Sequence, residues 1–134
     1  MDPEMLKIHD NVTIVAKVIF VMHDAIRHVL VKCFNEKFIP HIGCIEIMDN
    51  VFIGLGFIIL PNVKIGKKSI VAAGSFVNKD VPDNVIVWGV PARIIGDINS
   101  LIEKRREETS LYYRYSYEEY VELLWDKFDK EKEK

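Results

Sequence analysis

A six-residue hydrophobic period runs through the middle of the chain. Between residues 47 and 82 a β-branched aliphatic side chain recurs at every sixth position: Ile47, Ile53, Ile59, Ile65, Val71 and Val77. An amphipathic helix would repeat its apolar positions every 3.6 residues, so a helix does not fit this pattern. A sustained hexapeptide period predicts a parallel β-helix, in which each six residues form one short strand and one corner. Three such units close one triangular coil, and the recurring aliphatic side chains stack inside it.

The same period extends toward the N-terminus. Ile8, Ile14 and Phe20 keep the spacing of six, so residues 8–25 predict about one further coil. The register then breaks, because the distance from Phe20 to the next inward position is not a multiple of six. We therefore interpret residues 24–45 as a loop that leaves the solenoid between two coils. Long ordered loops tend to carry function.

Small residues and an end segment complete the predicted solenoid. Gly54 and Gly66 each follow an inward aliphatic residue, at corners where a Cβ would crowd the turn. Residues 85–88 predict a last strand, followed by a turn. We expect Ile94 and Ile95 to cover the open end of the stack, because an uncapped solenoid exposes its core.

The C-terminal part of the chain predicts helices. We divide the sequence into a β-helix domain over residues 1–96 and a helical extension over residues 97–134. Asp97 is a candidate N-cap for a short charged helix, and Ser116 with Glu119 forms a capping-box signature for a second. The second helix carries an apolar stripe at helical spacing: Tyr117, Tyr120, Val121, Leu124, Trp125 and Phe128. We expect this stripe to pack on the solenoid or on a neighbouring subunit rather than to bind a ligand.

Composition and charge exclude several classes of function. The chain has 134 residues, enough for one domain with its own core, and a formal net charge of −2. That charge gives no electrostatic case for binding nucleic acid or an anionic membrane. No run of 18 apolar residues predicts a membrane span, and the N-terminal segment has no signal-peptide pattern. Cys33 and Cys44 do not make a disulfide framework, so we expect reduced thiols and a cytoplasmic protein.

The repeat segment resembles a known family. The stretch IGLGFIILPNVKIGKKSIVAAGSFVNKDVP followed by WGVPARII is similar to the hexapeptide-repeat (left-handed β-helix) acyltransferases, most closely to the branch that O-acetylates sugars and polysaccharides. The resemblance covers about residues 6–96 and extends to the helical tail. It implies an all-β solenoid with left-handed coils, against the usual right-handed crossover rule. It also implies a homotrimer, acetyl-CoA bound as co-substrate between neighbouring subunits, and a saccharide or polysaccharide-precursor acceptor.

His23 is the candidate catalytic residue. It lies in FVMHDA at the root of the predicted loop, where the family has a histidine, usually in a THD or THP setting. Here Met22 replaces the threonine and Asp24 is kept. A sugar hydroxyl is a poor nucleophile, and an imidazole can take its proton as a general base. A histidine taken alone is more often buried against a backbone carbonyl, but the matching motif favours catalysis.

Five further residues would hold the donor if the resemblance extends to its binding site. The resemblance suggests that a backbone N–H at the corner of Leu55 stabilises the oxyanion of the tetrahedral intermediate. Ala73 matches a family contact with the pantetheine chain. Asn78 and Lys79 stand where the family usually has Thr-Lys, and Lys79 and Arg93 supply positive charge for the phosphates. Ordinary solvated surface charge is the alternative for the two cations.

Two other interpretations compete with acetyl transfer. The γ-class carbonic anhydrases share this fold and bind zinc through three histidines, but His23 and His28 have no matching third ligand in this sequence. A non-catalytic trimeric scaffold or binding module is the stronger alternative. His9 and Met48, which replace the usual second-place glycines, favour that alternative, and so does Trp88. Trp88 stands where a small residue is usual and could stack on the adenine or obstruct it.

Overall fold

The computed structural model describes residues 3–133, and the chain divides into two compact units. The first unit extends to Ile98 and the second begins at Asn99. After a 3-10 turn over Pro3–Met5, the first unit makes a first circuit of three short strands and, after a long excursion, two further circuits. In order, its parallel strands are β1 (Leu6–Ile8), β2 (Thr13–Ile14), β3 (Ile19–Phe20), β4 (Ile45–Ile47), β5 (Phe52–Ile53), β6 (Ile58–Ile59), β7 (Val63–Ile65), β8 (Ile70–Val71) and β9 (Phe76–Val77).

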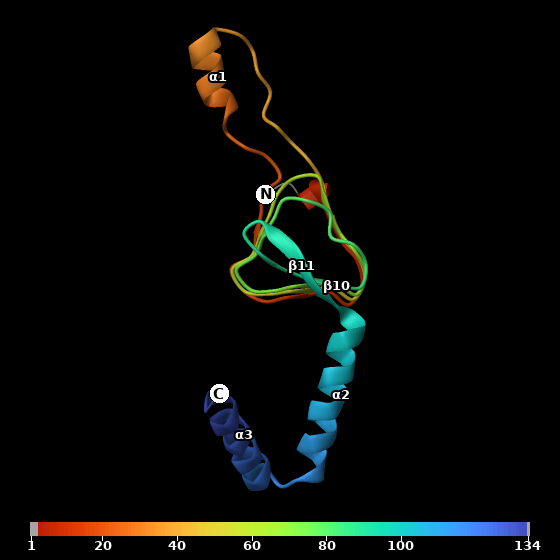
Figure 1. Cartoon of the computed structure of the whole chain (residues 1–134). Helices are drawn as coiled ribbons and strands as arrows, with labels where there is room; N and C mark the ends of the chain where they lie inside the picture. Colours follow the sequence, from red (N-terminus) through yellow and green to blue (C-terminus); the bar gives the residue numbers. More distant parts are fainter. Residues whose placement is uncertain (1–2, 134) are drawn as a thin grey trace. The chain divides into compact units, whose positions relative to one another are not determined.

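Each circuit visits three sheets in turn. The strand orders are β1-β4-β7, β2-β5-β8 continuing into the C-terminal hairpin, and β3-β6-β9, and every pairing between circuits is parallel. Ile53 pairs with Val71, so each strand lies beside the strand three hexapeptides later. Figure 1 shows the successive turns superposed as a triangle. The prediction of short parallel strands around three faces, with no helix in residues 47–82, is confirmed.

The recurring aliphatic residues form the core. Each of the six positions predicted to point inward is at most 1% exposed: Ile47, Ile53, Ile59, Ile65, Val71 and Val77. Phe57, at 0% exposed, is a fully buried aromatic member of this core. Ser69 and Ser75 are also buried, and each hydroxyl donates to a carbonyl three residues earlier, at 2.6 and 2.7 Å. A polar residue is tolerated inside this core because its hydrogen bond is satisfied locally.

Two corners require glycine. A Cβ on Gly54 would lie 2.7 Å from the backbone nitrogen of Ala73 in the next circuit. A Cβ on Gly66 would lie 2.6 Å from the backbone nitrogen of Asp83. Both distances are shorter than van der Waals contact with backbone atoms that cannot move aside, so the expected crowding at these corners is confirmed.

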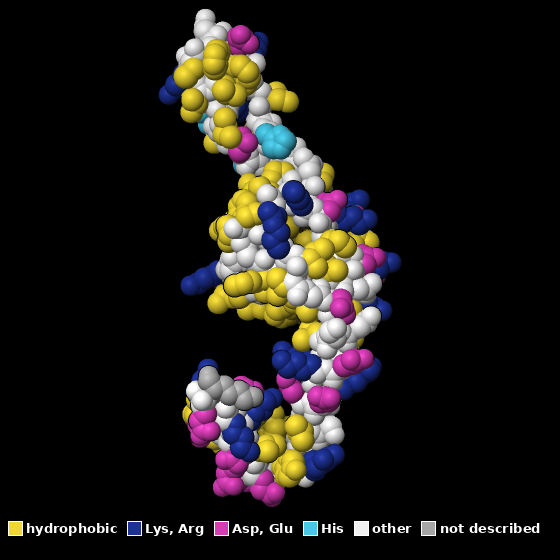
Figure 2. Space-filling view, viewed as in Figure 1, with side chains coloured by type: hydrophobic (Ala, Val, Ile, Leu, Met, Phe, Trp, Pro, Cys, Tyr) yellow, Lys and Arg dark blue, Asp and Glu magenta, His cyan; other side chains and the backbone are white. Residues whose placement is uncertain are grey.

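The excursion between the first two circuits is partly helical. The sequence predicted a loop over residues 24–45, but the structure contains α1 (Arg27–Phe34) there and β4 begins at Ile45. The sequence did not predict this helix, because its N-cap residue Ile26 has no side chain that could form a capping hydrogen bond and mark the helix start. Figure 2 shows apolar side chains gathered over the α1 segment, and Ile26, Val29 and Phe34 are each at least 60% exposed.

A β-hairpin ends the first unit. β10 (Val85–Gly89) adds to β8 in parallel, and β11 (Ala92–Asp97) returns antiparallel to it as the edge strand. The expectation that Ile94 and Ile95 cover the open end was wrong, because their side chains are 58% and 59% exposed. Val85 and Ala92 pack against the core instead. The hairpin partner was missed because an antiparallel return lies outside the hexapeptide period.

The second unit is a pair of helices. α2 (Ile98–Arg114) begins directly after Asp97 and is longer than expected, and α3 (Tyr117–Lys132) follows it. Ser116 caps α3 as predicted, because its hydroxyl accepts from the Glu119 N–H at 3.2 Å. The rings of Tyr112 and Tyr120 pack edge-to-face between the two helices at 5.2 Å. Leu124, Trp125 and Phe128 remain about half-exposed on α3, so the partner expected for this stripe stays a prediction. Within residues 3–133, no helix is long and apolar enough to cross a membrane.

Candidate active site

His23 is exposed at the root of the excursion. Its backbone forms an isolated antiparallel bridge with Ile42, so the two ends of the excursion are tied together at this point. Beside it, the Gly43 N–H donates to the Met22 carbonyl at 2.9 Å. Met22 takes the inward position and is 3% exposed, which directs the following residue outward. An imidazole held on a fixed backbone and open to solvent can reach an external hydroxyl.

Asp24 does not orient this imidazole. Its Oδ1 accepts a hydrogen bond from the Ile26 N–H at 3.1 Å and so shapes the entry to α1. Among the described residues His23 has no side-chain hydrogen bond. A partner for its second ring nitrogen would therefore come from the acceptor, water or another chain.

Leu55 and Ala73 lie at one corner in consecutive circuits. The Gly74 N–H donates to the Leu55 carbonyl at 2.8 Å, and the missing Cβ of Gly54 leaves room for Ala73. The neighbouring N–H groups of Gly54, Gly56 and Gly74 are all engaged with other circuits. The N–H groups of Leu55 and Ala73 donate no hydrogen bond among residues 3–133, so each is a free donor at the surface of the corner.

Asn78, Lys79 and Arg93 share a pocket of about 320 Å³ at the last circuit. Its floor is apolar, because the inward residues Val77, Val81 and Val87 reach it. The one acid on its wall, Asp80, accepts a hydrogen bond from the Lys64 N–H at 2.9 Å. Neither cation forms an ion pair among the described residues, so both charges are available to an anion.

Within one chain, the candidate base, the candidate oxyanion donors and the candidate phosphate-binding residues lie apart. His23 follows β3, and Asn78 follows β9 in the same sheet, so both leave from the same edge of the triangle in different circuits. Leu55 and Ala73 follow β5 and β8 of another sheet and occupy a different corner. The pocket with Asn78 contains neither the candidate base nor this corner. The sequence analysis assigned all six residues to one site. In the structure His23 stands alone, Leu55 and Ala73 share one corner, and Asn78, Lys79 and Arg93 share the pocket.

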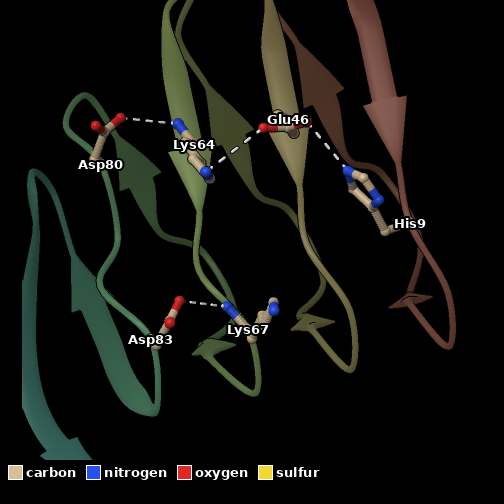
Figure 3. Close-up of polar contacts among 6 residues, drawn as sticks. All are labelled: His9, Glu46, Lys64, Lys67, Asp80 and Asp83. Atoms are coloured by element: carbon tan, nitrogen blue, oxygen red, sulfur yellow. Dashed lines mark hydrogen bonds and ion pairs between the residues drawn. The ribbon is translucent and has the colours of Figure 1, made fainter.

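A polar network covers one face of the solenoid, and sequence reasoning did not find it. The side chains of Lys7, Glu46 and Lys64 follow one another along the outer face of β1-β4-β7. Figure 3 shows Glu46 between His9, at 3.1 Å, and the Lys64 ammonium, at 3.8 Å. The hydrogen bond with His9 lowers the pKa of the Glu46 carboxyl below its ordinary value, desolvation opposes this effect, and the Lys64 charge lowers the pKa further. The contribution of ionised Glu46 to folding stability is therefore fully present above the ordinary pKa of a glutamate, and it is lost as the pH falls through the lowered pKa of Glu46.

This network is structural. It is open to solvent, where ion pairs contribute little, and it ties the first circuit to the next two. Figure 3 also shows that the Lys67 backbone N–H donates to Asp83 at 2.8 Å, one corner further on. Among the described residues, no three His, Cys, Asp or Glu side chains are grouped to hold a metal ion.

Comparison with known proteins gives relatives by sequence, although no family model matches the chain. Protein CapG of Staphylococcus aureus is 39% identical over 127 residues, which are 95% of this chain and 73% of that protein. A galactoside O-acetyltransferase of Lactococcus lactis is 49% identical over 55 residues, which are 41% of this chain and 27% of that protein. The chain thus spans much less than two thirds of the length of this second relative.

Solved structures share the same architecture. A galactoside acetyltransferase in complex with coenzyme A aligns with a TM-score of 0.63 and 38% identity, over 73% of this chain and 48% of that one. A hexapeptide-repeat acetyltransferase from Vibrio cholerae, complexed with acetyl coenzyme A, aligns with a TM-score of 0.53 and 26% identity. That alignment covers 71% of this chain and 61% of the other.

Proposed function

The chain belongs to the hexapeptide-repeat acyltransferases, and from this membership we propose that it transfers an acetyl group from acetyl-CoA to a saccharide hydroxyl. The observation that carries the proposal is the pocket in which Lys79 and Arg93 have no ion-pair partner among the described residues. Two such cations above an apolar floor suit a phosphorylated donor. The name of the related galactoside O-acetyltransferase supports a sugar acceptor. The similarity of the repeats supports left-handed coils.

The chemistry needs a base and an oxyanion donor. His23 takes the proton of the acceptor hydroxyl as its oxygen attacks the thioester carbonyl. The N–H of Leu55 or Ala73 donates to the oxyanion of the tetrahedral intermediate, because both are free and lie where glycine keeps the corner open. The intermediate then collapses, the carbon–sulfur bond breaks, and the proton held by His23 is available to the departing thiolate.

The first test concerns the donor phosphates. Charge reversal at Arg93 (R93E) or Lys79 (K79E) should weaken CoA binding by about 10- to 100-fold, because each removes a charge-assisted hydrogen bond and adds repulsion. The loss should be smaller for dephospho-CoA, which lacks the 3′-phosphate. Calorimetric titration measures both, and K130E on exposed α3 is the matched control. If the binding of CoA and of dephospho-CoA is weakened equally, the 3′-phosphate does not bind in this pocket. A wild-type protein that does not bind CoA would refute the proposed donor.

Assembly completes the proposed site. Since one chain places His23 and the Leu55 corner apart, we propose a homotrimer in which the base of one subunit meets the donor corner of its neighbour. The outer faces support this arrangement. The face of β1-β4-β7 is charged, whereas the outward residues of the other two sheets are mostly apolar: Thr13, Phe52 and Ile70, and Ile19, Ile58 and Phe76. A ring of three prisms covers two faces of each and leaves one in solvent.

We predict that Phe52→Glu dissociates the trimer. Phe52 is 40% exposed on the outer face of β5, and a carboxylate buried there without a partner should raise the dissociation constant by about 100-fold. Lys7→Glu on the charged face is the control and should leave assembly unchanged. Sedimentation velocity at micromolar concentration distinguishes the species. A monomeric wild-type protein would contradict the trimer and the shared site with it.

A further inference from the structure

Trp88 is a large aromatic side chain at a position that is small in the two circuits directly before it. Val87 pairs with Val71, which pairs with Ile53, so Trp88 stands in the register of Ala72 and Gly54. Those residues are small because the next circuit passes directly beside them, as the 2.7 Å contact at Gly54 illustrates. β10 is followed by an antiparallel return instead of another circuit. The steric limit is therefore absent at Trp88, and a bulky side chain fits.

The indole is available to a ligand. Trp88 is 57% exposed, and among the described residues its indole makes no ring contact, cation–π contact or hydrogen bond. An exposed tryptophan without a partner leaves a large apolar area in water. Solitary exposed apolar residues are common, so exposure alone assigns nothing. What distinguishes Trp88 is the residue opposite.

Arg93 is the cross-strand partner of Trp88. The two residues are paired directly in the β10–β11 hairpin. Residues opposite each other in an antiparallel pair point to the same face, with Cβ atoms about 4.5–5.5 Å apart. Arg93 also lines the pocket that contains Lys79. The hairpin therefore places one flat aromatic surface opposite Arg93, which shares its pocket with Lys79. Neither cation has an ion-pair partner among the described residues.

This combination fits a phosphorylated purine nucleotide. A base stacks on an aromatic side chain through its π face, and phosphates take the positive charges. A neutral sugar could also stack on indole, but it would leave both cations without a counterpart. We propose that Trp88 is the stacking platform for the adenine of the donor, while Arg93 and Lys79 bind its phosphates. This inference rests on the proposed use of CoA and assigns the nucleotide end of that ligand to the hairpin.

The experiment uses the full chain with Trp125 replaced by phenylalanine, which leaves Trp88 as the only tryptophan because the sequence has two. Titration with CoA should quench or shift the Trp88 fluorescence, and pantetheine, which lacks the nucleotide, should leave it unchanged. In the otherwise native chain, Trp88→Ala should weaken CoA roughly 5- to 100-fold, as expected for loss of one base–aromatic stack. Trp88→Phe keeps a ring and should recover most of the affinity. Pantetheine affinity should be the same in all three proteins.

The outcomes separate this inference from the proposed function. If the wild-type chain binds CoA but the Trp88 signal does not respond, or Trp88→Ala binds CoA as tightly, Trp88 is not the platform and the acetyltransferase proposal stands. If an acceptor sugar alone changes the fluorescence and CoA does not, Trp88 belongs to the acceptor site. If Trp88→Ala does not fold, the fluorescence titration of the folded Trp125→Phe protein still decides. If wild-type protein binds no CoA, both proposals fail.

Discussion

Replacing His23 by alanine should lower the rate of acetyl transfer by about 10²- to 10⁴-fold, the usual contribution of a histidine base. The imidazole acts on the proton of the acceptor and not on the nucleotide, so acetyl-CoA affinity and assembly should stay nearly unchanged. Steady-state kinetics at saturating acceptor measures the turnover number, and calorimetry measures the affinity.

A matched control is available on the same excursion. His28 is exposed on α1, and His28→Ala should retain turnover within about twofold, as expected for a surface change outside the reaction. Full turnover in His23→Ala would remove this residue from the mechanism, whereas an unaltered protein without turnover would favour a non-catalytic trimeric scaffold. A parallel loss in both variants would point to the excursion as a whole rather than to one imidazole.

Truncating Phe57 to alanine should lower the free energy of unfolding by about 3–5 kcal/mol. The side chain is 0% exposed between two circuits, so its removal leaves a cavity that the stacked backbone can collapse only in part. Urea unfolding followed by circular dichroism measures the change, with all proteins at one concentration because assembly contributes to apparent stability.

Phe34 provides the control for that truncation. It is the same residue type on α1 but 64% exposed, so Phe34→Ala should change the free energy of unfolding by no more than about 0.5 kcal/mol. Comparable losses at both positions would mean that the excursion is buried in the assembled protein. A loss below about 1 kcal/mol at Phe57 would contradict a continuous core through the stack.

The hexapeptide period by itself predicted the short parallel strands stacked in three sheets. The spacing of six between Ile47 and Val77 predicted that each of these aliphatic residues points inward, and each strand indeed pairs with the strand three units earlier. The need for glycine at positions 54 and 66 was predictable for the same reason. The backbone of one circuit approaches the next circuit closely at these corners, and this approach follows from the repeat alone. The cap of α3 was also local, so Ser116 and Glu119 identified it.

Features that depend on distant contacts were decided only by the tertiary structure. The return of β11 follows no period and depends on pairing with β10, so the exposure of Ile94 and Ile95 was not readable in sequence. Helix α1 has no side-chain cap, and its apolar residues gave no local boundary. The candidate site shows the same division. Sequence motifs named His23, Leu55 and Arg93 individually, but their separation over different corners follows from how the circuits stack. The free N–H of Leu55 and the pairing of Trp88 with Arg93 likewise exist only once the strands are in register.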